Sequence, residues 1–191
     1  MSSVRALTLA DVAVPRANLA WDAAMIVVAS LVTALAAQVA MPLPWSPVPV
    51  TGQTFAVLLS AMALGARRAF LAQVLYLAEG VAGLPVFAGG AAGAHILMGP
   101  TAGYLAAFPL AAALTGFLAE RGWDRRFVTT MAAMLLGSAV IFASGLAWLA
   151  RFVPAEHLMS TGFLPFVPGD LIKSALAAIA FPAAWRFARR P

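Results

Sequence analysis

Long stretches without a charged residue constrain this chain more than any other feature. No Asp, Glu, Lys or Arg lies in residues 23–66, 80–119 or 127–150. A helix of about 20 residues crosses the roughly 30 Å hydrocarbon core of a membrane, and each of these stretches is longer than that. Hydrophobic residues make up 63% of the 191 residues and charged residues only 10%, whereas soluble domains carry about 25%. The sequence therefore predicts an all-α, polytopic membrane protein.

Six transmembrane helices are predicted between the charged residues and the Pro and Gly clusters. They cover residues 22–41, 52–66, 69–84, 101–119, 128–150 and 169–186. Residues 22–191 are therefore predicted to form one six-helix transmembrane domain. Residues 1–21 are predicted to be a short cytoplasmic or interfacial leader.

Arginine placement predicts the orientation, because basic residues in short loops stay on the cytoplasmic side. If both termini are cytoplasmic, ten arginines fall on the inner side and only Arg151 on the outer side. The inner arginines are Arg5, Arg16, Arg67, Arg68, Arg121, Arg125, Arg126, Arg186, Arg189 and Arg190. This bias assigns residues 41–50, 85–100 and 150–165 to the outside.

The first two outer loops are unusually apolar, since neither contains Asp, Glu, Lys or Arg. One interpretation places them in the headgroup zone, with Trp45 as an interfacial anchor. The other folds them back over the helices as lids on a buried site, because non-helical backbone is tolerated at membrane depth where it lines a cavity.

Two charged residues lie inside the last predicted helix. Pro168 suits the start of a helix, so Asp170 lies in the first turn, where the helix dipole stabilises a carboxylate. Lys173 is on the same face, about 10 Å below the outer boundary of the hydrocarbon core. Three interpretations stay open: the charges neutralise each other, Lys173 extends to the headgroups, or both bind a polar ligand with a carboxylate and N–H donors.

Other polar residues are predicted in the same outer half of the molecule. Glu79 is near the outer end of the third helix and Tyr76 is one turn before it, while Gln53 and Thr54 begin the second helix. These residues either line one chamber with Asp170 and Lys173, or Glu79 is only an interfacial carboxylate. His95 either joins the chamber or is exposed to solvent.

Several classes of function lack their sequence signatures. The chain has no cysteine, no GxxxxGK[ST], no HExxH and no GxSxG. Its basic residues are not clustered as on a nucleic-acid-binding face. We therefore predict no catalytic residues, metal ligands or cofactor, and favour a binding subunit that takes energy from a partner. An autonomous carrier or channel and an intramembrane enzyme or scaffold are the alternatives.

Four motifs between about residues 30 and 182 share one order and spacing with a known family. They are "AAQVAMPLPWSPVPVTGQTFAVLLSAMALGAR", "LYLAEGVAGLPVFAGGAAG", "GPTAGYLAAF" and "FLPFVPGDLIK". Together they closely resemble the BioY family, the biotin-specific S components of energy-coupling factor transporters.

The resemblance implies a six-helix protein of the bacterial inner membrane that captures biotin in an outward-facing pocket. It implies that Asp170 hydrogen-bonds the ureido ring and that Lys173 holds the valerate carboxylate. It also implies that the loops after the first and third helices cap the pocket. The full set of candidate biotin-binding residues is Asp170, Lys173, Glu79, Tyr76, Gln53, Thr54, Trp45, Gly89 and Gly90.

The partners implied by the resemblance are a transmembrane coupling protein and ATP-binding cassette ATPases. S components dock through small residues of the first helix, and here Ala29, Thr33 and Ala37 form such a stripe. Alternatively, the stripe packs inside the bundle or faces lipid. Self-association is left open.

Overall fold

The computed structural model describes residues 8–13 and 18–188 of the chain. Most of these residues are helical. The elements, with η for a 3₁₀-helix, are α1 (Leu9–Ala13), α2 (Leu19–Gln38), β1 (Ala40–Leu43), β2 (Ser46–Thr51), α3 (Gln53–Leu64), α4 (Ala66–Val81), η1 (Ala88–Gly90), η2 (Ala94–Met98), α5 (Ala102–Ala119), η3 (Trp123–Arg125), α6 (Phe127–Leu149), η4 (Ala155–His157), α7 (Leu158–Gly162) and α8 (Val167–Ala188).

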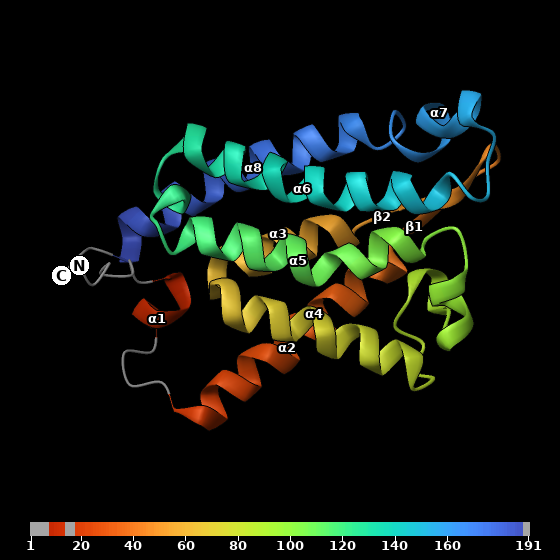
Figure 1. Ribbon diagram of the computed structural model, residues 1–191. Helices are drawn as coiled ribbons and strands as arrows, with labels where there is room; N and C mark the ends of the chain where they lie inside the picture. The colour runs from red at the N-terminus through yellow and green to blue at the C-terminus, as the bar shows by residue number, and fades with distance from the viewer. Residues whose placement is uncertain (1–7, 14–17, 189–191) are drawn as a thin grey trace, which may run out of the picture.

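The long helices run back and forth between two ends of the molecule (Figure 1). At one end, α1 and the last turns of α8 lie near η3, where Asp124 accepts a hydrogen bond from the indole N–H of Trp185. At the other end, the β1–β2 hairpin contacts α7, and the Ser46 hydroxyl donates to the carbonyl of Thr161 at 2.8 Å. The segments predicted as inner loops therefore gather at one end and those predicted as outer loops at the other.

Each of the six predicted helices corresponds to an α-helix, and every boundary agrees within three residues. The start of α2 shows why the boundary shifts. The side chain of Asn18 accepts a hydrogen bond from the backbone N–H of Trp21 at 3.0 Å and so caps the helix. The helix therefore starts at Leu19, three residues before the predicted start. The helix thus begins inside the stretch that was predicted as leader.

The rest of that leader is only partly described, since residues 1–7 and 14–17 lie outside the described residues. The described part forms α1, which contacts α3 and α8. Arg68 of α4 pairs with Asp11 of α1 at 2.7 Å and with Asp22 of α2 at 2.8 Å. One guanidinium therefore joins three helices at this end of the molecule.

Four segments of the described chain are long and apolar enough to cross a membrane. They are Leu19–Gln38, Ala102–Ala119, Phe127–Leu149 and Ala155–Ala188. The apolar helix α3 has only 12 residues, or about 18 Å of helix. Apolar helices on this scale agree with the predicted polytopic membrane protein.

The first predicted outer loop is a β-hairpin, so the description of the chain as all-α was incomplete. β1 and β2 are antiparallel, and Ala40 pairs with Thr51 and Leu43 with Ser46. Pro42, Pro44, Pro47 and Pro49 lack the N–H that a helix needs, and proline is tolerated in strands that have a free edge. The prolines therefore prevent this segment from forming a helix, and it forms a short two-stranded hairpin instead.

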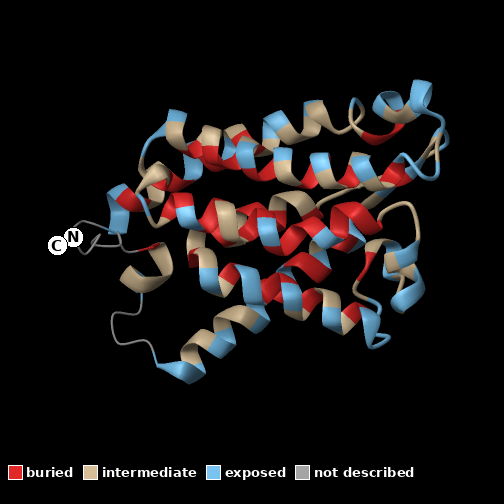
Figure 2. Ribbon diagram, in the orientation of Figure 1, coloured by how far each residue is buried: buried red, intermediate tan, exposed pale blue. Residues whose placement is uncertain are grey.

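α5 is the central helix and carries much of the buried surface (Figure 2). It contacts α3, α4 and α6. Its buried face is rich in small residues, which let neighbouring backbones approach closely. One close approach is at Gly116, which packs against the turn between α3 and α4 at Gly65, a residue with a φ of +82°.

The stripe predicted to dock a partner is buried inside the bundle. Thr33 and Ala37 are fully buried and Ala29 is 4% exposed. The Thr33 hydroxyl accepts a hydrogen bond from Gln73 of α4 at 3.2 Å. This burial favours the alternative interpretation, in which the stripe packs inside the bundle, because its small residues allow α2 to pack against α4; docking through the stripe stays a prediction. The large apolar residues that α2 exposes include Val27, Val28, Leu31, Val32 and Leu35.

Replacing Gly116 with alanine should destabilise the bundle. The new Cβ would overlap the backbone of Gly65 and Ala66, which cannot move aside as a flexible side chain would. Overpacking of this kind costs about 1–3 kcal/mol, so the melting temperature in detergent should fall by roughly 3–10 °C. Gly99→Ala is the matched control, because its φ is −82° and its nearest neighbour, the Ile96 carbonyl, is at 3.5 Å. Equal melting temperatures for the two variants would contradict this packing.

Candidate functional site

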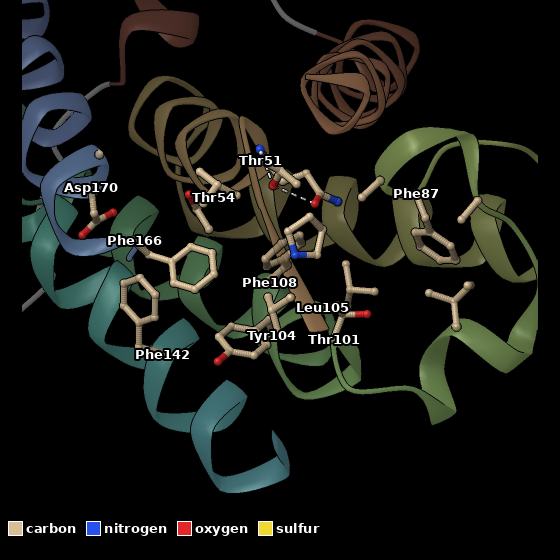
Figure 3. A pocket seen from close by; sticks show the side chains of 18 of the residues that line it. Thr51, Thr54, Phe87, Thr101, Tyr104, Leu105, Phe108, Phe142, Phe166 and Asp170 are labelled. Carbon is tan, nitrogen blue, oxygen red and sulfur yellow. Dashed lines mark hydrogen bonds between the residues drawn. The ribbon is translucent and has the colours of Figure 1, made fainter. Parts of the chain in front are cut away.

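A cavity of about 220 Å³ lies among α3, α5, α6 and α8, at the end of the molecule that holds the hairpin (Figure 3). The four helices contribute lining side chains, and so do the hairpin and the loop after α4. The lining residues are Val48, Pro49, Val50, Thr51, Gln53, Thr54, Phe87, Ala88, Ala91, Ile96, Thr101, Tyr104, Leu105, Phe108, Phe142, Phe166, Gly169, Asp170 and Lys173.

Asp170 reaches the cavity from the first turn of α8. The helix starts at Val167, so Pro168 lies in the first turn, where its missing N–H is not needed. The Asp170 carboxylate accepts a hydrogen bond from the Ser138 hydroxyl of α6 at 2.8 Å. Ser138 therefore fixes one carboxylate oxygen and leaves the other free to accept bonds from a ligand.

Lys173 lies one turn further along α8 on the same face. Its ammonium group donates a hydrogen bond to the backbone carbonyl of Thr51 at 2.9 Å, at the end of strand β2. An ammonium group has three donors, so two remain for other acceptors in the cavity. The hairpin thus supplies the first acceptor for a charge that is expensive to hold among apolar helices.

Asp170 and Lys173 do not form an ion pair with each other in the described part of the chain. Each has its own uncharged partner instead, Ser138 for the carboxylate and the Thr51 carbonyl for the ammonium. The interpretation that the two charges merely neutralise each other is therefore not supported by direct contact. Both charges remain able to bind a ligand.

Aromatic rings form much of the cavity wall near these polar groups. Tyr104 and Phe108 of α5, Phe142 of α6 and Phe166 before α8 all line the cavity (Figure 3). The ring centroids of Phe142 and Phe166 are 6.1 Å apart. The Tyr104 hydroxyl donates to the carbonyl of Gly162 at 2.8 Å, so its polar atom is already satisfied. These rings offer apolar faces to a ligand.

Two loops also line the cavity. Val48 of the hairpin and Phe87 of the loop after α4 both face it, yet they are only 5% and 1% exposed. The Phe87 ring packs against Gly80, where no Cβ would fit. Both loops therefore fold back against the helices rather than extend into the surroundings.

This arrangement suits a small molecule that has an apolar part and both an anionic group and N–H donors. The ammonium of Lys173 can bind a carboxylate, and the free carboxylate oxygen of Asp170 can accept N–H donors. Within residues 8–13 and 18–188, no three His, Asp or Glu side chains come together as a metal-binding group would. The geometry is that of a binding pocket for an amphiphilic anion.

Four of the nine residues predicted from the sequence line the cavity: Asp170, Lys173, Gln53 and Thr54. Tyr76 does not line it, but is fully buried directly behind Gln53 and accepts a hydrogen bond from its side-chain N–H₂ at 2.6 Å. Tyr76 therefore supports the wall rather than forming it.

The other predicted residues lie away from the cavity lining. Glu79 accepts a hydrogen bond from the Ser30 hydroxyl, between α4 and α2. Trp45 is at the hairpin turn and 62% exposed. Gly89 and Gly90 form an exposed turn with positive φ, while their neighbours Ala88 and Ala91 line the cavity. The side chain of His95 is exposed too, as the alternative interpretation of that residue expected.

The sequence did not single out the aromatic wall, Thr51 or Ser138. Tyr104 and Phe166 fall within the quoted motifs "GPTAGYLAAF" and "FLPFVPGDLIK". An aromatic residue in an apolar helix gives no sign of whether it faces lipid, core or cavity. Thr51 acts through its backbone carbonyl, which no side-chain pattern can reveal.

Comparison with known proteins matches the chain to the BioY family over residues 7–190. The chain is 40% identical to the probable biotin transporter BioY of Pyrococcus horikoshii over 147 residues, which cover 77% of this chain and 85% of that protein. It is 43% identical to the biotin transporter BioY of Thermotoga maritima over 138 residues, which cover 72% and 80%. The resemblance inferred from the four motifs is confirmed.

A solved structure shares the fold. It is the crystal structure of the S-component for biotin from an ECF-type ABC transporter, with a TM-score of 0.73. The match covers 89% of this chain and 92% of that chain, at 24% sequence identity. The helical architecture described above is therefore that of a known membrane protein.

Proposed function

Because the chain belongs to the BioY family, we propose that it captures biotin in the cavity between α3, α5, α6 and α8 for uptake across the membrane. Relatives with 40% and 43% identity are named as biotin transporters, and the chain covers at least 80% of each. Neither relative is named as an enzyme. The family therefore favours transport over the alternative of an intramembrane enzyme.

The observation that carries the proposal is one ammonium and one carboxylate on the same face of α8, in a cavity with aromatic walls. Biotin has a carboxylate at the end of an apolar chain and a ureido ring with two N–H groups. Lys173 holds the carboxylate, and the free oxygen of Asp170 accepts from the ureido ring. The rings of Tyr104, Phe108, Phe142 and Phe166 line the cavity and contact the apolar part of the ligand.

The proposed topology has six membrane crossings, made by α2, α3, α4, α5, α6 and α8. Both termini are cytoplasmic, because the arginine-rich segments gather at one end of the bundle. The cavity then opens toward the outer side, and the hairpin and the loop after α4 are its lids. α3 is short for a membrane crossing. In this proposal the hairpin that precedes α3 fills the outer part of that crossing.

Energy for uptake comes from partner subunits in this proposal. The solved structure with the same fold is an S-component of an ECF-type ABC transporter. We assign this chain the same part, as the biotin-capturing subunit of a transporter in the bacterial inner membrane. A transmembrane coupling protein and ATP-binding cassette ATPases complete it. Biotin is the transported ligand, and no cofactor is required.

Lys173→Ala should weaken biotin binding by about 1.5–3 kcal/mol, the range for losing a hydrogen bond to a charged group. Equilibrium binding of labelled biotin to detergent-purified protein measures the effect. Biotin methyl ester should bind the wild type more weakly than biotin, because its head group is neutral. For the variant this preference should largely disappear.

Glu79→Gln is the control for that experiment. It neutralises an acidic residue that sequence patterns placed in the site but that bonds Ser30 outside the cavity. Its biotin affinity should stay close to that of the wild type. If the wild type binds acid and ester equally well, Lys173 does not hold the carboxylate.

Cysteine labelling tests the proposed orientation. Trp45→Cys and Met98→Cys replace side chains that are 62% and 75% exposed at the hairpin end of the molecule. An impermeant thiol reagent should label both in intact cells, and the native chain has no cysteine to interfere. Arg126→Cys, at the opposite end, should react only after permeabilisation. Labelling of Arg126→Cys in intact cells would contradict the orientation.

A further inference from the structure

A chain of hydrogen bonds connects Lys173 to both loops that line the cavity. Lys173 donates to the Thr51 carbonyl at 2.9 Å, and the Thr51 hydroxyl donates to the side-chain carbonyl of Gln53 at 2.9 Å. The Gln53 N–H₂ group donates to the Tyr76 hydroxyl at 2.6 Å. The Tyr76 hydroxyl in turn donates to the backbone carbonyl of Val86 at 3.1 Å. The chain therefore begins at the cavity and ends in the loop after α4.

Gln53 and Tyr76 form the buried centre of this chain. Gln53 is 5% exposed and Tyr76 is not exposed at all. Buried polar groups are costly without partners, so these bonds hold both side chains in one arrangement. Their two outer partners, Thr51 and Val86, belong to different loops. Movement of either loop would leave a buried polar group without its partner.

The loop after α4 also contacts α4 itself through an aromatic pair and a backbone hydrogen bond. The Phe87 ring packs edge-on against the Tyr76 ring, with 5.6 Å between centroids. The backbone N–H of Gly93 also donates to the carbonyl of Gly80 at 2.7 Å. Tyr76 is therefore in contact with this loop through both its hydroxyl and its ring.

We propose that Gln53 and Tyr76 are positioning residues that hold the two loops closed together and so set the rates at which ligand enters and leaves the cavity. This inference rests on the proposed function, because it assumes that biotin occupies the cavity. Tyr76 does not line the cavity, so it acts through Gln53 and the loops and not through the ligand. Lys173 joins the chain to the ligand, since it has donors for both the Thr51 carbonyl and a carboxylate.

The proposal makes a kinetic prediction that separates it from other roles. If the loops must open for both entry and exit, a weaker closure speeds both steps and changes the dissociation constant little. A residue that contacts the ligand would instead change mainly the dissociation rate. A residue that only stabilises the fold would lower the melting temperature and leave both rates unchanged.

The test is Tyr76→Phe, which removes one hydroxyl and keeps the ring. Association and dissociation rates of biotin are measured on the purified full chain by rapid mixing and by chase with unlabelled biotin. Both rates should rise by about three- to tenfold, as expected for the loss of one or two buried hydrogen bonds, while the dissociation constant changes by less than about threefold. The other loop attachments, such as Ser46 to Thr161, remain and limit the effect.

Thr130→Val is the matched control. The Thr130 hydroxyl is fully buried and donates to the carbonyl of Trp123 at 3.0 Å, at the opposite end of the molecule. Its loss should lower the melting temperature without changing either biotin rate. Equal rate changes in Tyr76→Phe and Thr130→Val would overturn the proposal.

Amide hydrogen exchange on the wild type decides the matter if Tyr76→Phe does not fold. Residues 46–52 and 84–93 should open with one common rate, and biotin should protect both segments together. Independent opening of the two segments would overturn the proposal. A wild type that binds no biotin would contradict the proposed function itself, whereas normal binding with unchanged rates in Tyr76→Phe would contradict only this inference.

Discussion

The charge of Lys173 is the constraint on which the cavity end of the molecule depends. An ammonium group among apolar helices costs about 2.5–3.5 kcal/mol at membrane depth unless it has acceptors. Here the acceptor is the Thr51 carbonyl, so the chain must fold back into the bundle after α2. The proline-rich hairpin meets this need because its strands are short and cannot continue the helix. Hairpin, cavity and charge are therefore parts of one arrangement.

The helices were predictable because one physical rule determines both where they lie and how charged and apolar residues are distributed along the sequence. Charged residues mark the ends of apolar stretches, and the backbone of each stretch must satisfy its own hydrogen bonds inside a membrane. Capping by Asn18 shows where the rule loses accuracy, because one side chain moved the start of α2 by three residues. The hairpin was missed because its prolines indicate only the absence of helix. Strand pairing depends on contacts between Ala40 and Thr51 that periodicity does not show.

The candidate site was predictable where a residue is chemically out of place. Asp170 and Lys173 stand out in an apolar helix, and both line the cavity. Glu79 stands out equally, yet it pairs with Ser30 between two helices, so an unusual charge does not identify its partner. Small residues are ambiguous in the same way. Ala29, Thr33 and Ala37 form a stripe suited to close packing, and only the structure shows that α4 is what packs against it.

A structure of the protein with biotin bound tests the central claim most directly. The account predicts a carboxylate oxygen of biotin about 2.8 Å from Nζ of Lys173, with the bond from Lys173 to the Thr51 carbonyl retained. It also predicts a ureido N–H directed at the Asp170 oxygen that Ser138 leaves free. Biotin bound with its carboxylate away from Lys173, or outside the cavity between α3, α5, α6 and α8, would contradict the account.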